Sequence, residues 1–184
     1  MVKLINFYQN LEFEIHLMNL SLIGLRGSGK TTLGKFLAKK LNKKFVDLDE
    51  EIEKGANSKI PEIVEKHGWN YFRNLESEIC AKFAKEKNLV IATGGGIVLK
   101  DENIKNLKQN GKIIFIKCPI ELCANRIKNS QNRPSLTGKN FIDEFQEIWE
   151  QRKEKYEKAA DFVLEDNGEK SLEDLISPID LLFI

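Results

Sequence analysis

The chain has 184 residues, of which 41% are hydrophobic and 31% are charged, as is usual for one soluble globular domain. Lys and Arg number 29 against 28 Asp and Glu, and this balance excludes the basic excess of a nucleic-acid-binding protein. No apolar run reaches the length of a membrane span, and the first residues lack the pattern of a signal peptide. We therefore expect a cytoplasmic protein with no nucleic-acid and no membrane partner.

Residues 1–17 show no clear pattern, and Met18 stands directly before the first predicted strand. We expect 1–17 to be an extension without a catalytic role and 18–184 to be a single domain. The alternative is that residues 11–17, LEFEIHL, pair as an extra strand that protects an edge of the sheet.

The stretch SLIGLRGSGKTT, residues 21–32, joins a predicted buried strand over 19–24 to a predicted helix over 30–41. Gly24, Gly29, Lys30 and Thr31 match the pattern G-x-x-x-x-G-K-[ST], whose backbone N–H groups surround phosphates. In this pattern Lys30 reaches the terminal phosphates of a nucleoside triphosphate as a point charge outside the core, and Thr31 holds Mg²⁺. A simple glycine turn is the alternative, but the strand before and the helix after favour a phosphate loop.

Strands and helices alternate along the rest of the chain. Further strands are predicted over residues 43–49, 88–96 (ending in a glycine turn), 111–118 and 161–165. Helices are predicted over residues 70–87, 101–110, 119–129, 141–160 and 171–182, with two short helices over 49–68 that break at Gly55 and Pro61. The helix over 70–87 should bury Phe72, Leu75, Ile79 and Phe83. This alternation predicts a three-layer α/β sandwich with a central five-stranded parallel sheet and ligands beyond the carboxyl ends of its strands.

Three cysteines, Cys80, Cys118 and Cys123, lie in apolar or helical surroundings and form no C-x-x-C pair. An odd number of thiols without such a pair indicates buried free cysteines in a reducing compartment. This agrees with the expected cytoplasmic location.

Asp47 and Asp49 end the second predicted strand, where the alternation of side chains would place both on one side. Two carboxylates beside a phosphate loop suit a contact to Mg²⁺ and a base for an attacking hydroxyl. The alternative is that Asp49 caps the helix that follows. We favour the chemical role because the phosphate loop is predicted to lie close by.

Three consecutive glycines, Gly94, Gly95 and Gly96, follow the third predicted strand. A turn seldom needs three glycines, whereas close approach of the backbone to a ligand explains them. We expect their N–H groups to bind hydroxyls or a carboxylate of a substrate, with turn geometry as the alternative.

Arg73 and Glu76 share a helix face, and Arg126, Arg133 and Arg152 flank or lie within the polar loop at 130–140. On pattern alone, the pair is an exposed ion pair and the arginines lie on the surface. The segment NRPSLTG nevertheless resembles a mobile lid, and an arginine on a lid can close over a transferring phosphate.

Six segments in this order, GLRGSGKTTLGKFLA, FVDLD, FRNLE, ATGGGIV, NRPSL and QRKEKY, resemble the shikimate kinase family of nucleoside-monophosphate-kinase-like P-loop NTPases. The resemblance runs from about Asn19 to near the C-terminus. It implies an ATP-dependent kinase that uses Mg²⁺ and phosphorylates the 3-hydroxyl of shikimate, in the pathway to chorismate and the aromatic amino acids. It also implies a substrate-binding insertion at about 49–77 and a lid at about 129–140. We expect the protein to be a monomer.

The resemblance assigns a role to each matching residue. ATP would be bound by Gly27, Ser28, Gly29, Lys30, Thr31, Thr32, Arg126 (against the adenine) and Arg133 of the lid. Shikimate would be bound by Asp49, Arg73, Gly94, Gly95, Gly96 and Arg152, with Arg73 and Arg152 on its carboxylate. The catalytic residues would be Lys30, Asp49 as the base, and Arg133. Thr31 and Asp47 would support Mg²⁺, and Glu76 would position the substrate arginines.

The chain departs from the family pattern at Trp69, where glutamate often follows the glycine, and at Ser135 of the lid, where leucine is usual. One alternative is a kinase of the same architecture that acts on gluconate or a nucleoside monophosphate. Gluconate is the closer of these two acceptors because it also carries a carboxylate. A second alternative is a nucleotide-binding regulatory module without turnover, against which the retained acidic and basic residues argue.

Overall fold

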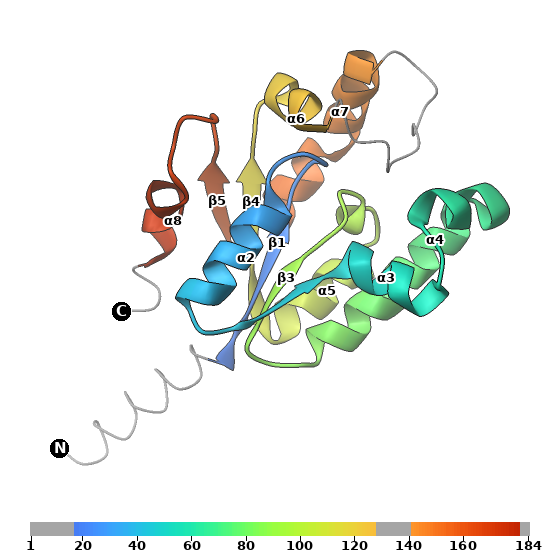
Figure 1. The fold of residues 1–184 in the computed structure, drawn as a ribbon, viewed down its shortest axis with the longest axis horizontal. Helices are drawn as coiled ribbons and strands as arrows, with labels where there is room; N and C mark the ends of the chain where they lie inside the picture. Colours follow the sequence, from blue (N-terminus) through green and yellow to red (C-terminus); the bar gives the residue numbers. More distant parts are fainter. Residues whose placement is uncertain (1–16, 128–140, 181–184) are drawn as a thin grey trace.

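In the computed structural model, which describes residues 17–127 and 141–180, five parallel strands form one sheet between two layers of helices (Figure 1). The strands are β1 (Asn19–Ile23), β2 (Lys44–Asp47), β3 (Leu89–Ala92), β4 (Gly111–Lys117) and β5 (Phe162–Glu165). Their order in the sheet is β2-β3-β1-β4-β5, so β1 occupies the centre. The predicted fold class is therefore confirmed, with all five strands parallel.

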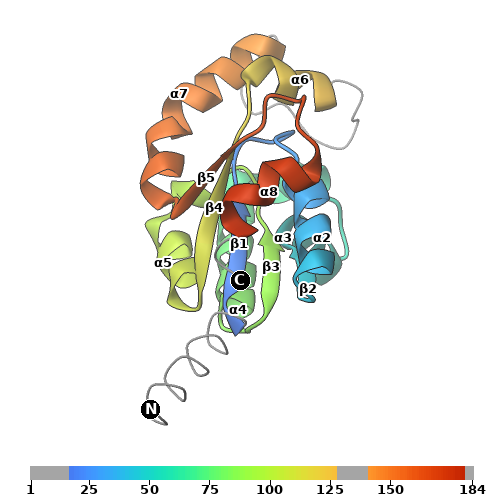
Figure 2. The same ribbon diagram turned by 90° about the vertical axis from the view of Figure 1, so that its left-hand side faces the viewer.

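The helices connect successive strands and cover both faces of the sheet (Figures 1 and 2). They are α2 (Lys30–Lys40), α3 (Leu48–Ala56), α4 (Ile60–Ala84), α5 (Asp101–Gln109), α6 (Ile120–Ile127), α7 (Phe141–Ala159) and α8 (Leu172–Asp180), with a 3₁₀ turn η1 (Ile97–Leu99). Because each crossover returns the chain to the same end of the sheet, the carboxyl ends of all strands meet at one edge. No helix in the described part of the chain is long and apolar enough to cross a membrane.

The strand β1 separates two hydrophobic clusters, one on each face of the sheet. Leu20 and Leu22 pack with α2 and α8, whereas Ile23 belongs to the cluster formed with α4, α5 and α7. Side chains alternate along a strand, so a strand buried on both faces is apolar at nearly every position. All five residues of β1 are buried, including the polar Asn19, whose side chain forms hydrogen bonds with backbone atoms of Glu86 and Leu89.

The segment between β2 and β3 differs from the prediction. Strand β2 ends at Asp47, whose carboxylate caps α3 by accepting a 3.0 Å hydrogen bond from the backbone N–H of Asp49. Gly55 lies inside α3, and Pro61 lies in the first turn of α4, where its missing N–H costs no hydrogen bond. The break between α3 and α4 lies at 57–59, between the two predicted positions, so the prediction of two helices here is confirmed. A kink at Gly68, whose φ is 81°, separates the first part of α4 from the rest, close to the predicted start of the helix over 70–87.

The buried face of α4 also differs from the prediction. Phe72 and Phe83 are buried as expected. Between them, however, the buried residues are Glu76 and Cys80 and not the predicted Leu75 and Ile79. The latter two are half-buried because α4 packs on a small second cluster around Ile52 and Ile63 as well as on the main core. The three cysteines are free and buried, as predicted.

Candidate active site

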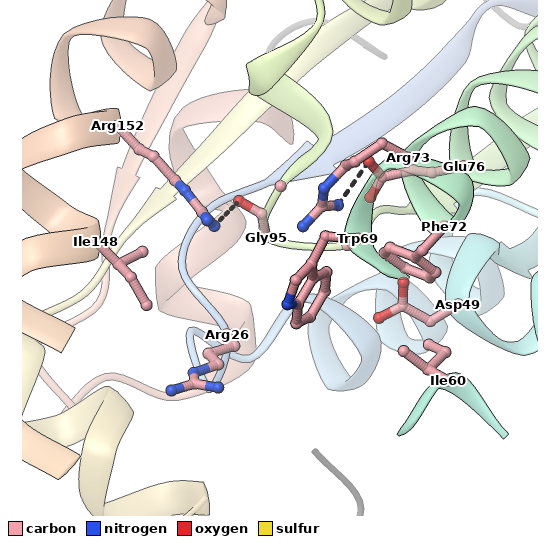
Figure 3. Close-up of a pocket in the computed structure, with 12 residues that line it drawn as sticks. Arg26, Asp49, Ile60, Trp69, Phe72, Arg73, Glu76, Gly95, Ile148 and Arg152 are labelled. Atoms are coloured by element: carbon pink, nitrogen blue, oxygen red, sulfur yellow. Dashed lines mark hydrogen bonds and ion pairs between the residues drawn. The ribbon is translucent and has the colours of Figure 1, made fainter. Parts of the chain in front are cut away.

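Two cavities at the carboxyl edge of the sheet contain most of the predicted site residues. The first, which we call the phosphate-loop cavity, is lined by Gly27, Gly29, Lys30, Thr31, Thr32, Asp47, Asp49, Thr93, Arg126 and Ile127. The second, the arginine cavity, is lined by Arg26, Asp49, Ile60, Trp69, Phe72, Arg73, Glu76, Gly94, Gly95, Gly96, Ile148 and Arg152 (Figure 3). Asp49 lines both cavities, so the two are neighbours.

The phosphate loop runs from the end of β1 into α2. Gly27 and Gly29 have φ angles of 80° and 91°, a left-handed conformation that glycine adopts without strain. The ammonium group of Lys30 donates hydrogen bonds to the carbonyl oxygens of Gly24 (3.0 Å) and Leu25 (2.7 Å). The Lys30 side chain is therefore buried and holds the loop together, which corrects the prediction of a point charge outside the core.

Thr31 and Asp47 meet where α2 begins and β2 ends. The Thr31 hydroxyl donates a 2.8 Å hydrogen bond to Oδ2 of Asp47, while Oδ1 of Asp47 caps α3. Within the described residues no three His, Cys, Asp or Glu side chains form a metal cluster. Mg²⁺ at a phosphate site needs only one or two protein oxygens, because phosphates and water supply the others. This pair of oxygens fits such an ion.

Asp49 lies in the first turn of α3 rather than at the end of β2, so the predicted strand alternation of Asp47 and Asp49 was wrong. The two carboxylates nevertheless line the phosphate-loop cavity together. The alternative that Asp49 caps α3 is also wrong, since Asp47 is the cap. Asp49 thus lines both cavities from the first turn of α3.

The triple glycine is explained by the side chains that pack against it. A Cβ atom at Gly94 would lie 2.8 Å from Oδ1 of Asp49, and a Cβ atom at Gly96 would collide with the guanidinium of Arg73. Substitution at either position would therefore displace a predicted site residue. The close approach seen here is to side chains of the site, and the predicted contact of the glycine N–H groups with a substrate stays a prediction.

Arg73 and Glu76 form an ion pair of 2.7 Å on the inner face of α4. Glu76 is almost fully buried, and burial raises the pKa of its carboxyl group against the opposing pull of Arg73. The guanidinium carbon of Arg73 also lies 4.9 Å and 5.5 Å from the ring centres of Phe72 and Trp69. The prediction of an exposed ion pair is therefore wrong. Glu76, Phe72 and Trp69 together hold the guanidinium group of Arg73 in place.

Arg152 reaches the arginine cavity from α7. Its Nη1 donates a 3.0 Å hydrogen bond to the carbonyl oxygen of Gly95 (Figure 3). The same oxygen accepts a 2.5 Å hydrogen bond from the hydroxyl of Tyr156. No carboxylate within the described residues pairs with Arg152, whose buried Nε lacks a hydrogen-bond partner there. The cavity thus contains a buried guanidinium without a counter-ion from the described chain.

Arg126 lines the phosphate-loop cavity from α6 and forms a 2.9 Å ion pair with Asp166. Ser28 of the loop lines a smaller adjoining cavity with Arg126 and Asp166. The predicted lid at 129–140, with Arg133 and Ser135, lies outside the described residues.

Several residues of the site were not predicted from the sequence. Arg26 of the phosphate loop lines the arginine cavity and forms a buried ion pair with Glu144 of α7. The phosphate-loop pattern places no requirement on the position of Arg26, and Glu144 is one of many acidic residues along its helix. Tyr156 belongs to the segment QRKEKY, but only the structure shows that its hydroxyl supports Gly95.

The comparisons with known proteins agree with this geometry. The profile of the shikimate kinase family matches residues 26–180. A shikimate kinase of Persephonella marina is 43% identical over 141 residues, which cover 77% of this chain and 85% of the relative. The crystal structure of a shikimate kinase from Acinetobacter baumannii in complex with shikimate superimposes with a TM-score of 0.84 at 35% identity, covering 90% of this chain and 92% of the other.

A gluconokinase from Sinorhizobium meliloti 1021 shares the fold at a lower level. Its structure covers 90% of this chain and 91% of its own with a TM-score of 0.56, but only 12% of the residues are identical. This likeness shows a common architecture and does not extend to the acceptor.

Proposed function

Because the chain belongs to the shikimate kinase family, we propose that its two cavities divide the reaction between a donor and an acceptor. Shikimate kinase is an ATP-dependent transferase of aromatic amino-acid biosynthesis that phosphorylates the 3-hydroxyl of shikimate. ATP is placed in the phosphate-loop cavity and shikimate in the arginine cavity. The observation that carries this assignment is the position of Asp49, which lines both.

On the donor side, the phosphate loop binds the phosphate chain of ATP through its backbone N–H groups and Lys30. The remaining contacts come from Ser28 and Thr32 of the loop, from Arg126 beside the adenine and from Arg133 of the lid. Thr31 and Asp47 hold Mg²⁺, which offsets negative charge on the phosphates when it is bound. The 2.8 Å contact between these two side chains supports their assignment to one ion.

On the acceptor side, Arg73 and Arg152 bind the carboxylate of shikimate. Arg73 is already paired with Glu76, whereas Arg152 has no carboxylate partner in the described chain, so Arg152 is the stronger anchor. Gly94, Gly95 and Gly96 form the wall beside these groups. Anchoring the carboxylate fixes which hydroxyl faces Asp49 and the terminal phosphate of ATP.

Asp49 is the base that accepts the proton of the reacting hydroxyl. It lies in the first turn of α3, against Gly94, and a Cβ atom at Gly94 would push its carboxylate away. The glycine therefore keeps Asp49 at the junction of the two cavities. We also propose that the enzyme acts as a monomer in the cytoplasm.

The test is a coupled assay of ADP release with shikimate, gluconate and a nucleoside monophosphate as acceptors. We expect turnover with shikimate at least about a hundredfold above that with the other two, since an acceptor of another shape leaves buried polar groups of the site unpaired. Preference for gluconate or a nucleotide would contradict the proposed acceptor. ATP binding without turnover of any acceptor would instead indicate a regulatory module.

A further inference from the structure

Arg26 and Glu144 form a buried ion pair that the roles described above do not use. Arg26 lies in the phosphate loop and Glu144 in the first turn of α7, 118 residues later. Their side chains are 9% and 2% exposed, and the guanidinium carbon of Arg26 lies 4.7 Å from the centre of the Phe145 ring. A buried ion pair adds little net stability, because both charges lose their hydration. The role of this ion pair is therefore better inferred from its position in the arginine cavity than from its contribution to stability.

Arg26 is one of three guanidinium groups around the arginine cavity, with Arg73 and Arg152 (Figure 3). Figure 3 shows Arg26 on a different side of the cavity from Arg73 and Arg152. The three guanidinium groups differ in whether a carboxylate balances their charge. Glu76 neutralises Arg73 and Glu144 neutralises Arg26, whereas Arg152 donates to the carbonyl oxygen of Gly95.

The backbone fixes the position of Arg26 as well. A Cβ atom at Gly95 would lie 3.2 Å from the backbone nitrogen of Arg26, so the phosphate loop packs directly on the glycine wall. Gly95 also accepts the hydrogen bonds of Arg152 and Tyr156. The guanidinium groups of Arg26 and Arg152 are thus attached to one rigid unit at different sides of the cavity.

We infer that Arg26 positions a ring hydroxyl of the acceptor and that Glu144 restricts it to this role by removing its net charge. This inference rests on the proposed function. Shikimate has one carboxylate and three hydroxyls. If Arg26 kept its full charge, the carboxylate could bind either to Arg26 or to Arg73 and Arg152, and shikimate would bind in two orientations. Because Glu144 balances the charge of Arg26, only Arg73 and Arg152 attract the carboxylate strongly. Arg26 has five N–H donors, so an ion pair does not exhaust its capacity to bind a hydroxyl.

Glu144 is therefore a specificity-determining residue that acts through Arg26. Without its charge, Arg26 would compete for the carboxylate and hold shikimate with the wrong end toward Asp49. Such inverted binding is nonproductive, so it lowers kcat without raising KM. A residue that only stabilised the fold would not produce this split.

The experiment compares Glu144→Gln with Glu150→Gln, which makes the same change at an exposed position of α7. We expect kcat with shikimate to fall about tenfold or more in Glu144→Gln, as for one charged interaction, with KM for shikimate unchanged or lower and KM for ATP unchanged. Cyclohexanecarboxylate, which has the carboxylate but no hydroxyls, should bind Glu144→Gln about tenfold more tightly than wild type in a calorimetric titration. Glu150→Gln should match wild type in all of these values.

The double variant Arg26→Met, Glu144→Gln covers the case in which Glu144→Gln does not fold, because it leaves no lone buried charge. It should bind shikimate about tenfold more weakly than wild type and cyclohexanecarboxylate equally well, since only a hydroxyl contact is lost. If the double variant bound both ligands more weakly to the same extent, the inference would be wrong while the proposed function would stand. The same holds if Glu144→Gln had the same kinetics as Glu150→Gln. Absence of turnover with shikimate in the wild type would overturn the proposed function and this inference with it.

Discussion

The hydroxyl of Thr31 donates a 2.8 Å hydrogen bond to the carboxylate of Asp47. This contact joins the first turn of α2 to the end of β2, across 16 residues of sequence. It brings two oxygen atoms of the kind that Mg²⁺ prefers to the edge of the phosphate-loop cavity. The other oxygen of Asp47 caps α3, so the metal role that we propose and a structural role would fall on one carboxylate.

These two roles can be separated with Asp47→Asn. Asparagine is as good a helix cap as aspartate, so thermal stability should stay close to that of wild type. The loss of the negative charge should lower the affinity for Mg²⁺, so the Mg²⁺ concentration that gives the half-maximal rate should rise by about 10–100-fold. This is the usual effect of losing a residue that supports a metal through water. Initial rates over a titration of Mg²⁺ at saturating ATP measure this effect. An unchanged Mg²⁺ titration would remove Asp47 from the metal site.

Lys30→Ala should lower both turnover and stability. The ammonium group binds the carbonyl oxygens of Gly24 and Leu25, which lose their donor in the variant. Hydrogen bonds to a charged group contribute about 1.5–3 kcal/mol each, so chemical denaturation should show a loss of at least about 1.5 kcal/mol. Thr32→Ala is the control for stability, because Thr32 is exposed and lies two residues after Lys30 in α2. Full stability in Lys30→Ala would mean that the loop does not need this bridge.

Much of the fold could be predicted because its determinants are local. The run NLSLI, the glycine pattern of the phosphate loop and the amphipathic helix after it are contiguous in sequence. The alternation of strands and helices then predicted a parallel sheet with right-handed crossovers, although not the strand order β2-β3-β1-β4-β5. The sequence also predicted that the site residues gather beyond the carboxyl ends of the strands, where the phosphate-loop cavity lies.

The rest depended on contacts between residues that are distant in sequence. The burial of Glu76 follows from the way α4 packs, not from its position in a helical pattern. The pairing of Arg26 with Glu144 spans 118 residues, and no local pattern marks either partner. The start of α3 was placed too late because aspartate suits both a strand end and a helix cap, and only the hydrogen bond to Asp49 decides between them.

Arg152→Ala should weaken the binding of shikimate far more than the binding of ATP. Removing one partner of a buried charged pair costs about 2–5 kcal/mol, and Arg152 is the guanidinium without a carboxylate partner in the described chain. The wall of the cavity should persist, because Tyr156 still donates to the carbonyl oxygen of Gly95. Arg152→Lys keeps the charge but loses the fork geometry, so it should bind with intermediate affinity. Separate calorimetric titrations of shikimate and ATP measure these values, and normal shikimate affinity in Arg152→Ala would refute the carboxylate assignment. We expect Arg73→Ala to show the same selective loss.

Glu76→Gln should change the pH dependence of stability in a defined direction. Burial raises the pKa of Glu76, so the folded protein retains a proton that the unfolded chain releases at its ordinary pKa of about 4.3. Between these two values the folded state binds more protons, and the stability of wild type therefore falls as pH rises. Glutamine has no such titration. Urea denaturation of both proteins from pH 4 to pH 8 should show the wild type losing stability relative to the variant as pH rises. Parallel profiles would mean that burial does not shift this carboxyl group.

A chain that begins at Met18 should fold and keep the KM values of the full chain, because all predicted site residues lie after it. The structure shows what such a truncation removes. The carbonyl oxygen of Leu17 accepts a 2.8 Å hydrogen bond from the backbone N–H of Asn88, and that of Met18 accepts one of 2.9 Å from the ammonium group of Lys43. The truncated chain retains the second contact and loses the first.

The matched control is a chain that begins with an initiator methionine followed by His16, which retains Leu17. We expect the chain from Met18 to be less stable than this control by about 1 kcal/mol, the usual contribution of one hydrogen bond, with the same turnover. Thermal denaturation and the coupled assay measure the two quantities. If residues 11–17 instead pair as an additional strand, both truncated chains should lose several times that stability relative to the full chain. That result would contradict the assignment of 1–17 as a dispensable extension, because the sheet would then depend on it.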